Sequence, residues 1–434
     1  MAAARVVPVD DTFEDFLAQE KTKDLLRFTT AGSVDDGKST LIGRLLYDSR
    51  NVYEDQVRAV TGTIAAPGQK QLAIDFAQLT DGLRAEREQG ITIDVAYRYF
   101  ATALRKFIVA DAPGHEQYTR NMVTAASTAH LAILLVDARH GIVTQTRRHA
   151  TLAHLLGIPH LVVAVNKMDL VGYRAEAFEA IVDDFLAFAG RSGITDVRFV
   201  PMSALEGDMV VDRGDMLGWY DGPTLLQILE TAELPASLAS AAFRFPVQYV
   251  ARPTAGQPRG YMGRIESGSI AVGERVRILP SGRTTQVREL RTLEGSPRCA
   301  GLHAGVTLIL ADEIDVSRGD LIVRDDGTPK LRRSLDATVC WLGDTPLDTR
   351  RKYLLRHTTR EVRARVDRID HLWDVATQQR QPAPLSLAMN DIAQIALTLA
   401  QPIFPDRYAE NRATGSFILI DETTNNTVAA GLVA

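Results

Sequence analysis

The chain has 434 residues, 45% of them hydrophobic and 24% charged. This ordinary globular composition is spread over more length than a single core needs, so we expect two or three domains. A formal net charge of −5 excludes a global basic field for nucleic-acid phosphates, though not a local basic patch. The two cysteines, Cys299 and Cys340, are too few and too isolated for a disulfide scaffold or a metal cluster.

Residues 25–234 alternate apolar strands with helical stretches. Polar or glycine-rich segments follow four of the five predicted strands directly, at the edge where an open α/β sheet binds ligands. Runs rich in Val, Ile and Leu suit strands that are buried on both faces. The five runs are 27–31, 106–110, 131–136, 161–165 and 198–202. This pattern predicts a mostly parallel sheet with a ligand site at its carboxyl edge.

A glycine-rich loop follows the first strand and precedes a predicted helix. It fits the pattern G-x-x-x-x-G-K-[ST], in which backbone N–H groups approach phosphate oxygens and the helix N-terminus adds a favourable partial charge. Lys38 is expected to neutralise the β- and γ-phosphates, and the Ser39 hydroxyl to bind Mg²⁺. A simple glycine turn before a helix is the alternative. The predicted nucleotide contacts here are Gly32, Ser33, Val34, Asp35, Asp36, Gly37, Lys38, Ser39 and Thr40.

Two further segments supply candidates for metal binding and catalysis. Asp111 follows a strand in an Asp-x-x-Gly pattern, where an aspartate of P-loop enzymes holds Mg²⁺ and the N–H of Gly114 would sense the γ-phosphate. His115 can orient the attacking water, although an exposed histidine at a helix start fits as well. Thr92 can complete the Mg²⁺ sphere in a two-state loop, whereas taken alone it reads as an ordinary strand threonine.

The candidate roles in these segments are therefore as follows. Catalysis is assigned to Lys38, Thr92 and His115, and the metal to Ser39, Thr92 and Asp111. The nucleotide contacts of the second segment are Asp111, Ala112, Pro113, Gly114 and His115.

The segments after the last two strands predict the base. The Asp169 carboxylate can accept both N1–H and N2–H of guanine, whereas adenine would leave it unpaired at a cost of about a few kcal/mol. Asn166 is expected to brace the loop and the base, and the Lys167 stem to lie over the ring; a strand-end Asx turn is the alternative. The predicted base contacts are Asn166, Lys167, Met168, Asp169, Ser203, Ala204 and Leu205, with a backbone N–H near Ala204 for guanine O6. Together these motifs predict a Mg²⁺-dependent GTPase that binds GTP and GDP.

The character of the sequence changes near Pro235. Short alternating runs such as 245–250 and 275–279 are separated by glycine, proline and serine, which is typical of small β-barrels. We therefore predict a GTPase domain over residues 1–240, a β-barrel domain over 241–330 and a second β-barrel domain over 331–434. The predicted fold class is an α/β P-loop GTPase domain with a mostly parallel sheet, followed by two β-barrel domains.

The motifs resemble those of translation-factor GTPases of the elongation factor Tu/1-alpha type. The shared patterns are Gly-x-Val-Asp-x-Gly-Lys-Ser, Gly-Ile-Thr-Ile, Asp-Ala-Pro-Gly-His and Asn-Lys-Met-Asp. Within that superfamily the chain is similar to the family of large GTPase subunits of bacterial sulfate adenylyltransferase. Residues 32–48, 79–83, 86–100 and 111–122 carry this resemblance. It implies a G domain followed by two β-barrels along the whole chain.

The resemblance also implies a partner and a reaction. A small adenylyl-transferring subunit, in a heterodimer or a higher assembly, would make adenosine 5′-phosphosulfate and pyrophosphate from ATP and sulfate, with GTP hydrolysis on this chain coupled to that uphill step. The sequence contains no Ser-Gly-Gly-x-Asp-Ser loop and no His-x-Gly-His motif, so sulfate adenylation is not expected on this chain alone. It contains no second P-loop pattern, so phosphorylation of adenylyl sulfate is not expected either.

Two alternatives stay open at this point. A translational GTPase that binds aminoacyl-tRNA would have the same fold and nucleotide site, and Arg259, Arg264 and the 356–368 region could form a local basic patch. The second alternative is a GTP-gated scaffold, in which GTP hydrolysis serves only as a timer. We expect no nucleic-acid partner. We also expect no membrane partner and a cytoplasmic location, because no apolar run approaches membrane-spanning length and the N-terminus turns acidic before a signal-peptide core could form.

Overall fold

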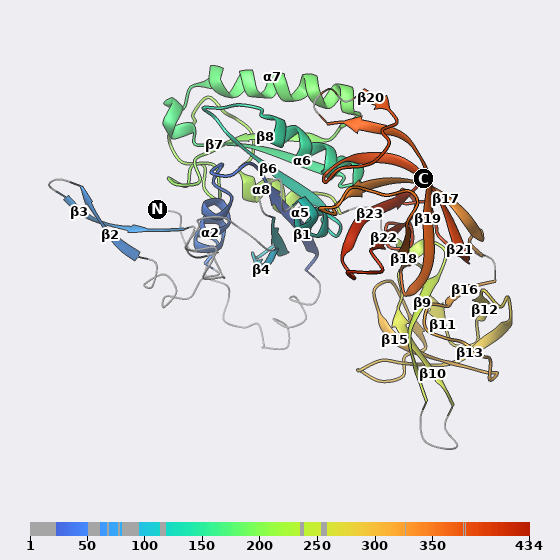
Figure 1. The fold of residues 1–434 in the computed structure, drawn as a ribbon. Helices are drawn as coiled ribbons and strands as arrows, with labels where there is room; N and C mark the ends of the chain where they lie inside the picture. The colour runs from blue at the N-terminus through green and yellow to red at the C-terminus, as the bar shows by residue number, and fades with distance from the viewer. Residues whose placement is uncertain are drawn as a thin grey trace, which may run out of the picture. The chain divides into compact units, whose positions relative to one another are not determined.

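The computed structural model describes residues 23–50, 61–66, 69–76, 79, 95–112, 119–234, 238–252, 258–325, 327–375, 377 and 379–434. The chain forms two compact units, Met1–Pro235 and Ala236–Ala434 (Figure 1). The first contains a mostly parallel sheet with helices, and the second is built from antiparallel strands. This confirms the predicted fold class. The finer division into 1–240, 241–330 and 331–434 stays a prediction.

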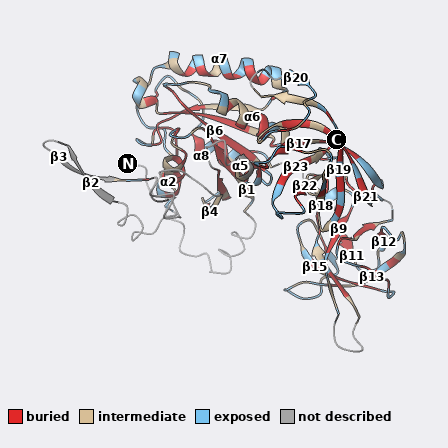
Figure 2. Ribbon diagram, in the orientation of Figure 1, coloured by how far each residue is buried: buried red, intermediate tan, exposed pale blue. Residues whose placement is uncertain are grey.

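A six-stranded sheet forms the centre of the first unit. Its order is β4-β5-β1-β6-β7-β8, with β4 antiparallel to β5 and the other neighbours parallel. The strands β6 and β7 are buried along almost their whole length, as Figure 2 shows, which explains their continuous apolar sequences. The strands are β1 (Leu25–Ala31), β4 (Ala96–Ala101), β5 (Lys106–Asp111), β6 (Leu131–Asp137), β7 (His160–Asn166) and β8 (Val197–Pro201).

Helices alternate with these strands along the chain. The longest, α7, buries Phe178, Ile181, Phe185 and Phe188, which recur every three or four residues on one helical face. None of the helices in the described ranges combines the length and the apolar character needed to cross a bilayer. The helices are α2 (Lys38–Asp48), α5 (Thr119–Ala126), α6 (Thr144–Leu155), the 3-10 helix η3 (Met168–Val171), α7 (Ala175–Ser192) and α8 (Leu225–Thr231), and β2 (Thr61–Ala66) pairs with β3 (Gln69–Ile74) as an antiparallel hairpin.

The second unit begins with the short 3-10 helix η4 (Leu238–Ser240) and a closed six-stranded barrel in the order β10-β15-β13-β12-β16-β9. Alternate side chains fill the interior, among them Phe243, Phe245 and Tyr261. The barrel strands are β9 (Arg244–Ala251), β10 (Gly260–Arg264), β12 (Arg275–Leu279), β13 (Thr284–Arg291), β15 (Gly305–Leu310) and β16 (Leu321–Arg324), and a small ribbon pairs β11 (Ile270–Ala271) with β14 (Cys299–Ala300).

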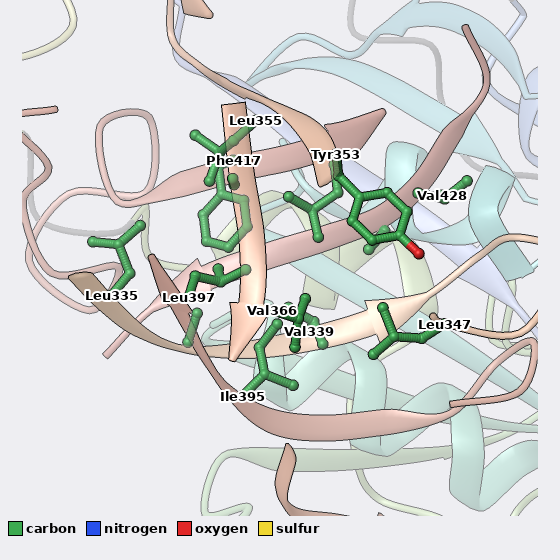
Figure 3. Close-up of a cluster of buried hydrophobic side chains, with 14 of the residues drawn as sticks. Leu335, Val339, Leu347, Tyr353, Leu355, Val366, Ile395, Leu397, Phe417 and Val428 are labelled. Carbon is green, nitrogen blue, oxygen red and sulfur yellow. The ribbon is translucent and has the colours of Figure 1, made fainter. Parts of the chain in front are cut away.

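Seven antiparallel strands make up the rest of this unit. Their order is β18-β22-β23-β17-β21-β19-β20, and β18 also pairs with β19, so six of them close on themselves and β20 extends the sheet. The enclosed core includes Leu355, Val366, Leu397 and Phe417 (Figure 3). The strands are β17 (Arg332–Trp341), β18 (Lys352–His357), β19 (Arg360–Asp374), β20 (Gln379–Pro382), β21 (Ile392–Ile403), β22 (Ser416–Ile420) and β23 (Thr427–Val433).

A buried ion pair joins the two barrels of the second unit. Arg244 on β9 donates through Nε and Nη2 to the two carboxylate oxygens of Asp406, at 2.9 and 2.8 Å, and the Thr414 hydroxyl donates to the same carboxylate at 2.6 Å. Burial alone would raise the pKa of Asp406, but the hydrogen bonds from Arg244 and Thr414 hold it below its usual value. The bidentate geometry fixes the approach of the two barrels.

Candidate nucleotide-binding site

Those predicted site residues that the structure describes lie at one edge of the parallel sheet. Parallel strands bring their carboxyl ends together, and the register pairs Thr30 of β1 with Asp111 of β5 and Asp137 of β6 with Asn166 of β7. The strand order therefore places the Asp111 segment, the phosphate loop, the Asn166 segment and the Ser203 segment in a row along this edge. Phosphate and metal groups suit one end of that row, and a base suits the other.

The phosphate loop has the backbone conformation that its glycines predict. Asp35 and Gly37 both have positive φ values, of 68° and 93°. A Cβ on Gly37 would lie 2.6 Å from Nδ2 of Asn166, so only glycine fits where the loop meets the Asn166 segment. α2 starts at the next residue, Lys38, and aims its free N–H groups at the loop.

Lys38 is buried inside this loop. Its Nζ donates to the carbonyl oxygens of Gly32 at 3.0 Å and Ser33 at 2.7 Å. Burial lowers the pKa of Lys38 below its usual value, against the opposing effect of Asp111 and Asp36. Both acceptors recorded among the described residues are neutral, and a buried ammonium ion so placed is a strong attractor for phosphate.

Asp36 braces the loop from within, a role that its sequence motif did not specify. Its Oδ2 accepts the backbone N–H of Ser33 at 2.6 Å, and its side chain is buried. Burial raises the pKa of this carboxyl, although the Ser33 hydrogen bond and Lys38 oppose the shift. The sequence signal for this role is an aspartate three residues after Ser33 in a tight loop, since an aspartate there can accept a nearby backbone N–H.

Asn166 connects the phosphate loop to the base-reading loops. Its Nδ2 donates to the Asp36 carbonyl at 2.8 Å, and its Oδ1 accepts the Ala204 N–H at 2.9 Å. The loop-bracing role expected of Asn166 therefore has the geometry that it needs. The Ala204 N–H is engaged with Asn166, and the donor to guanine O6 from this loop stays a prediction.

Two oxygen partners, a carbonyl and a carboxylate, hold the Lys167 ammonium group in place. Its Nζ donates to the Asp35 carbonyl and forms an ion pair with Asp137 Oδ2 at 2.9 Å. Burial would raise the pKa of Asp137, but Arg139 and Lys167 hold it far below its usual value. Sequence reasoning left Asp137 without a role, although its position at the end of a buried strand on the same sheet edge was a signal. Anchoring the ammonium fixes the aliphatic stem that is predicted to cover the base.

The remaining base-site residues lie on two adjoining turns. The Met168 N–H donates to the Met202 carbonyl at 3.2 Å, which joins η3 to the end of β8. Ser203 and Ala204 are buried, Asp169 is partly exposed, and the Leu205 side chain is 58% exposed. A carboxylate and an exposed leucine on neighbouring turns suit a base that is read at its edge and covered on its face.

The metal candidates within the described residues fit Mg²⁺. Asp111 is buried at the end of β5, where it accepts the Thr30 hydroxyl at 3.3 Å, and Ser39 is the second residue of α2. A carboxylate and a hydroxyl beside a phosphate site are the hard oxygen ligands that Mg²⁺ takes alongside phosphates. Thr92, Pro113, Gly114 and His115 lie outside the described residues, so their predicted roles stay predictions.

Changing Gly37 to alanine is expected to weaken GTP binding by about tenfold, because the new Cβ forces a left-handed residue out of shape and displaces Asn166 from Asp36. The matched control is Gly190→Ala, where a Cβ meets nothing within 4 Å on α7. Titration with a fluorescent GTP analogue checks both variants. Equal affinities for the two would contradict the steric argument.

A phosphate loop at the carboxyl edge of a mostly parallel sheet is the arrangement of a P-loop GTPase. Residues 23–236 match the family model "Elongation factor Tu GTP binding domain", and residues 334–434 match "GTP-eEF1A C-terminal domain-like". The class is thus a GTPase of the elongation factor Tu type.

Relatives that match nearly the whole chain identify its family. Proteins named sulfate adenylyltransferase subunit 1 are 50% identical over 418 residues in Bacteroides fragilis and 52% identical over 419 residues in Laribacter hongkongensis, covering 96% of this chain and 87% of each relative. The bifunctional enzyme CysN/CysC of Mycobacterium tuberculosis is 53% identical over 413 residues, which cover 94% of this chain and 67% of that protein. The chain belongs to the sulfate adenylyltransferase subunit 1 family.

Proposed function

We propose that this chain binds GTP with Mg²⁺, hydrolyses it, and couples the hydrolysis to the synthesis of adenosine 5′-phosphosulfate from ATP and sulfate on a smaller partner subunit. Membership of the family makes the chain the GTPase subunit of a sulfate-activating enzyme. The observation that carries the proposal is the single row of phosphate, metal and base motifs along one sheet edge. The name "subunit 1" of its relatives supports at least one other subunit.

The residues have separate roles in this proposal. Lys38 would bind the β- and γ-phosphates from inside the loop, and Asp169 would read the base. Ser39, Thr92 and Asp111 would hold Mg²⁺, which neutralises phosphate charge when it is bound. His115 would orient the attacking water. The Thr92 and Gly114 segments would respond to the γ-phosphate, which makes the site a switch.

The arrangement of arginines favours sulfate activation over binding of aminoacyl-tRNA. Arg264 pairs with Glu266 at 2.7 Å, and Arg363 pairs with Glu422 at 2.8 Å. The same holds along β19, where Arg365 pairs with Asp367 at 3.0 Å and Arg368 with Asp370 at 2.7 Å. Carboxylates at this distance cancel the positive field that attracts a phosphate backbone. We therefore propose no nucleic-acid partner. As separate proposals, the chain has no membrane partner, is cytoplasmic, and forms a heterodimer or higher assembly with the smaller subunit.

Coupling predicts that the partner accelerates GTP hydrolysis. Mixing the purified chain with the adenylyl-transferring subunit, ATP and sulfate should raise its GTPase rate at least about tenfold, because such sites hydrolyse slowly until water and charge are aligned. Phosphate release and adenylyl sulfate formation are measured together, with sulfate omitted as the control. A GTPase rate that does not change with the partner and both substrates would count against coupling. Hydrolysis without any gain in adenylyl sulfate would favour a scaffold with a timer.

A further inference from the structure

Arg44 connects the helix after the phosphate loop to the loop that is predicted to close the base pocket. It lies on α2, and its Nη1 donates to the Leu205 carbonyl at 3.1 Å. The two residues are 161 positions apart in sequence. The Arg44 side chain is 20% exposed, and the hydrogen bond to Leu205 lies at the exposed side of the turn. A hydrogen bond from a charged donor fixes the orientation of the Leu205 peptide group.

Two neighbours hold the Arg44 guanidinium in this position. Nε donates to Asp48 Oδ2, one helical turn further along α2, at 2.7 Å. The Phe76 ring lies against the guanidinium, with 4.9 Å between Cζ and the ring centroid. Phe76 reaches α2 because Gly43 has no side chain, since a Cβ there would lie 2.0 Å from the Phe76 carbonyl oxygen.

The base-closing loop is shaped to receive this side chain. Gly207 has a φ of 95°, and a Cβ there would lie 2.1 Å from Nη2 of Arg44. Its N–H donates to the Ser203 carbonyl at 2.8 Å, so Gly207 closes the turn that contains Ser203, Ala204 and Leu205. The same glycine therefore supplies both the turn and the room for the guanidinium.

We propose that Arg44 is a positioning residue for guanine-nucleotide retention, which holds the Ser203–Gly207 turn in its base-binding shape. The inference rests on the proposed guanine-nucleotide site and deepens it. A turn that is already ordered gives up little conformational freedom when the base enters, so binding is tighter. Without Arg44 the turn opens more readily, and the nucleotide leaves faster. Arg44 touches neither the phosphate loop carbonyls nor the metal candidates in the described contacts, so the hydrolysis step of bound GTP is unaffected.

The test is the dissociation rate of fluorescent GDP and GTP analogues from the full chain. Arg44→Met keeps the length of the side chain and removes its donors. It should speed the dissociation of both nucleotides by about tenfold, while the single-turnover rate of hydrolysis of bound GTP stays unchanged. The dissociation rates of Arg44→Lys should lie between those of the wild type and Arg44→Met, because lysine keeps the charge without the planar guanidinium group. Arg147→Met on α6 is the control, because it removes an arginine whose described ion pair runs to Asp184 on α7 and not to the Ser203–Gly207 turn.

A double-mutant cycle with Gly207→Ala isolates the contact. Gly207→Ala alone should speed release by displacing the guanidinium, and its additional effect in the Arg44→Met chain should be smaller. Additive effects would overturn the proposal. So would unchanged dissociation in Arg44→Met, or parallel losses of the single-turnover rate and melting temperature that mark a general folding role. Wild-type chain that fails to bind either analogue would instead overturn the guanine-nucleotide site itself.

Discussion

Alanine in place of Lys38 is expected to lower kcat/KM for GTP hydrolysis by about 10²–10³-fold. The ammonium group is buried within the phosphate loop, where it donates to the Gly32 and Ser33 carbonyls. The substitution removes the positive charge that faces the phosphates and leaves two loop carbonyls without their donor, so both binding and transition-state stabilisation suffer. Single-turnover hydrolysis of GTP measures the loss.

The matched control for this experiment is Lys352→Ala, an exposed lysine on β18 in the second unit. It removes the same charge from the chain without touching the phosphate loop, and its kcat/KM should equal that of the wild type. Circular dichroism checks that both variants are folded. A loss of less than about tenfold in Lys38→Ala would show that this lysine is not the phosphate ligand.

The strands of the central sheet are well predicted because burial on both faces demands long apolar runs. The run 131–136 becomes β6, Leu131–Asp137, and the run 161–165 becomes β7, His160–Asn166. Each strand extends past its apolar run because the polar residues at the carboxyl end still pair, as Asp137 does with Asn166. Apolar composition therefore locates a strand, whereas backbone pairing decides where it ends.

The connections that tie the site together were not predictable from the motifs. Lys167 meets Asp137, and Arg44 meets Leu205, only because the order of the strands brings those segments to one edge. A motif records the groups that face a ligand, and it carries no information about polar partners that are distant in sequence. Asp36 differs, since its bond to Ser33 is local and follows from the chemistry of an aspartate in a tight loop.

In the second unit, the sequence predicts the kind of fold but not which strands lie side by side. Frequent turn signals predict small barrels, and the structure has a closed six-stranded barrel and a seven-stranded sheet in which six strands close on themselves. The turn signals do not predict the strand order, because β10 (Gly260–Arg264) pairs with β15 (Gly305–Leu310), and four other strands lie between them along the chain. Alternating apolar residues say which side of a strand is buried, and they do not say which strand lies beside it.

Asparagine in place of Asp169 is expected to weaken GTP binding by about a hundredfold and to shift preference toward xanthosine triphosphate. The carboxylate can accept both N1–H and N2–H of guanine, whereas an amide offers one acceptor and a donor that suits the O2 of xanthine. Asn166 and Lys167 remain in place, because their contacts run to Asp36, Ala204, Asp35 and Asp137 and not to Asp169. Competition binding with the two nucleotides measures the shift, and Asp212→Asn, an exposed residue on a neighbouring loop, is the control. If Asp169→Asn keeps its preference for GTP, then Asp169 does not read the base, and the selectivity must come from the backbone of the Ser203 turn.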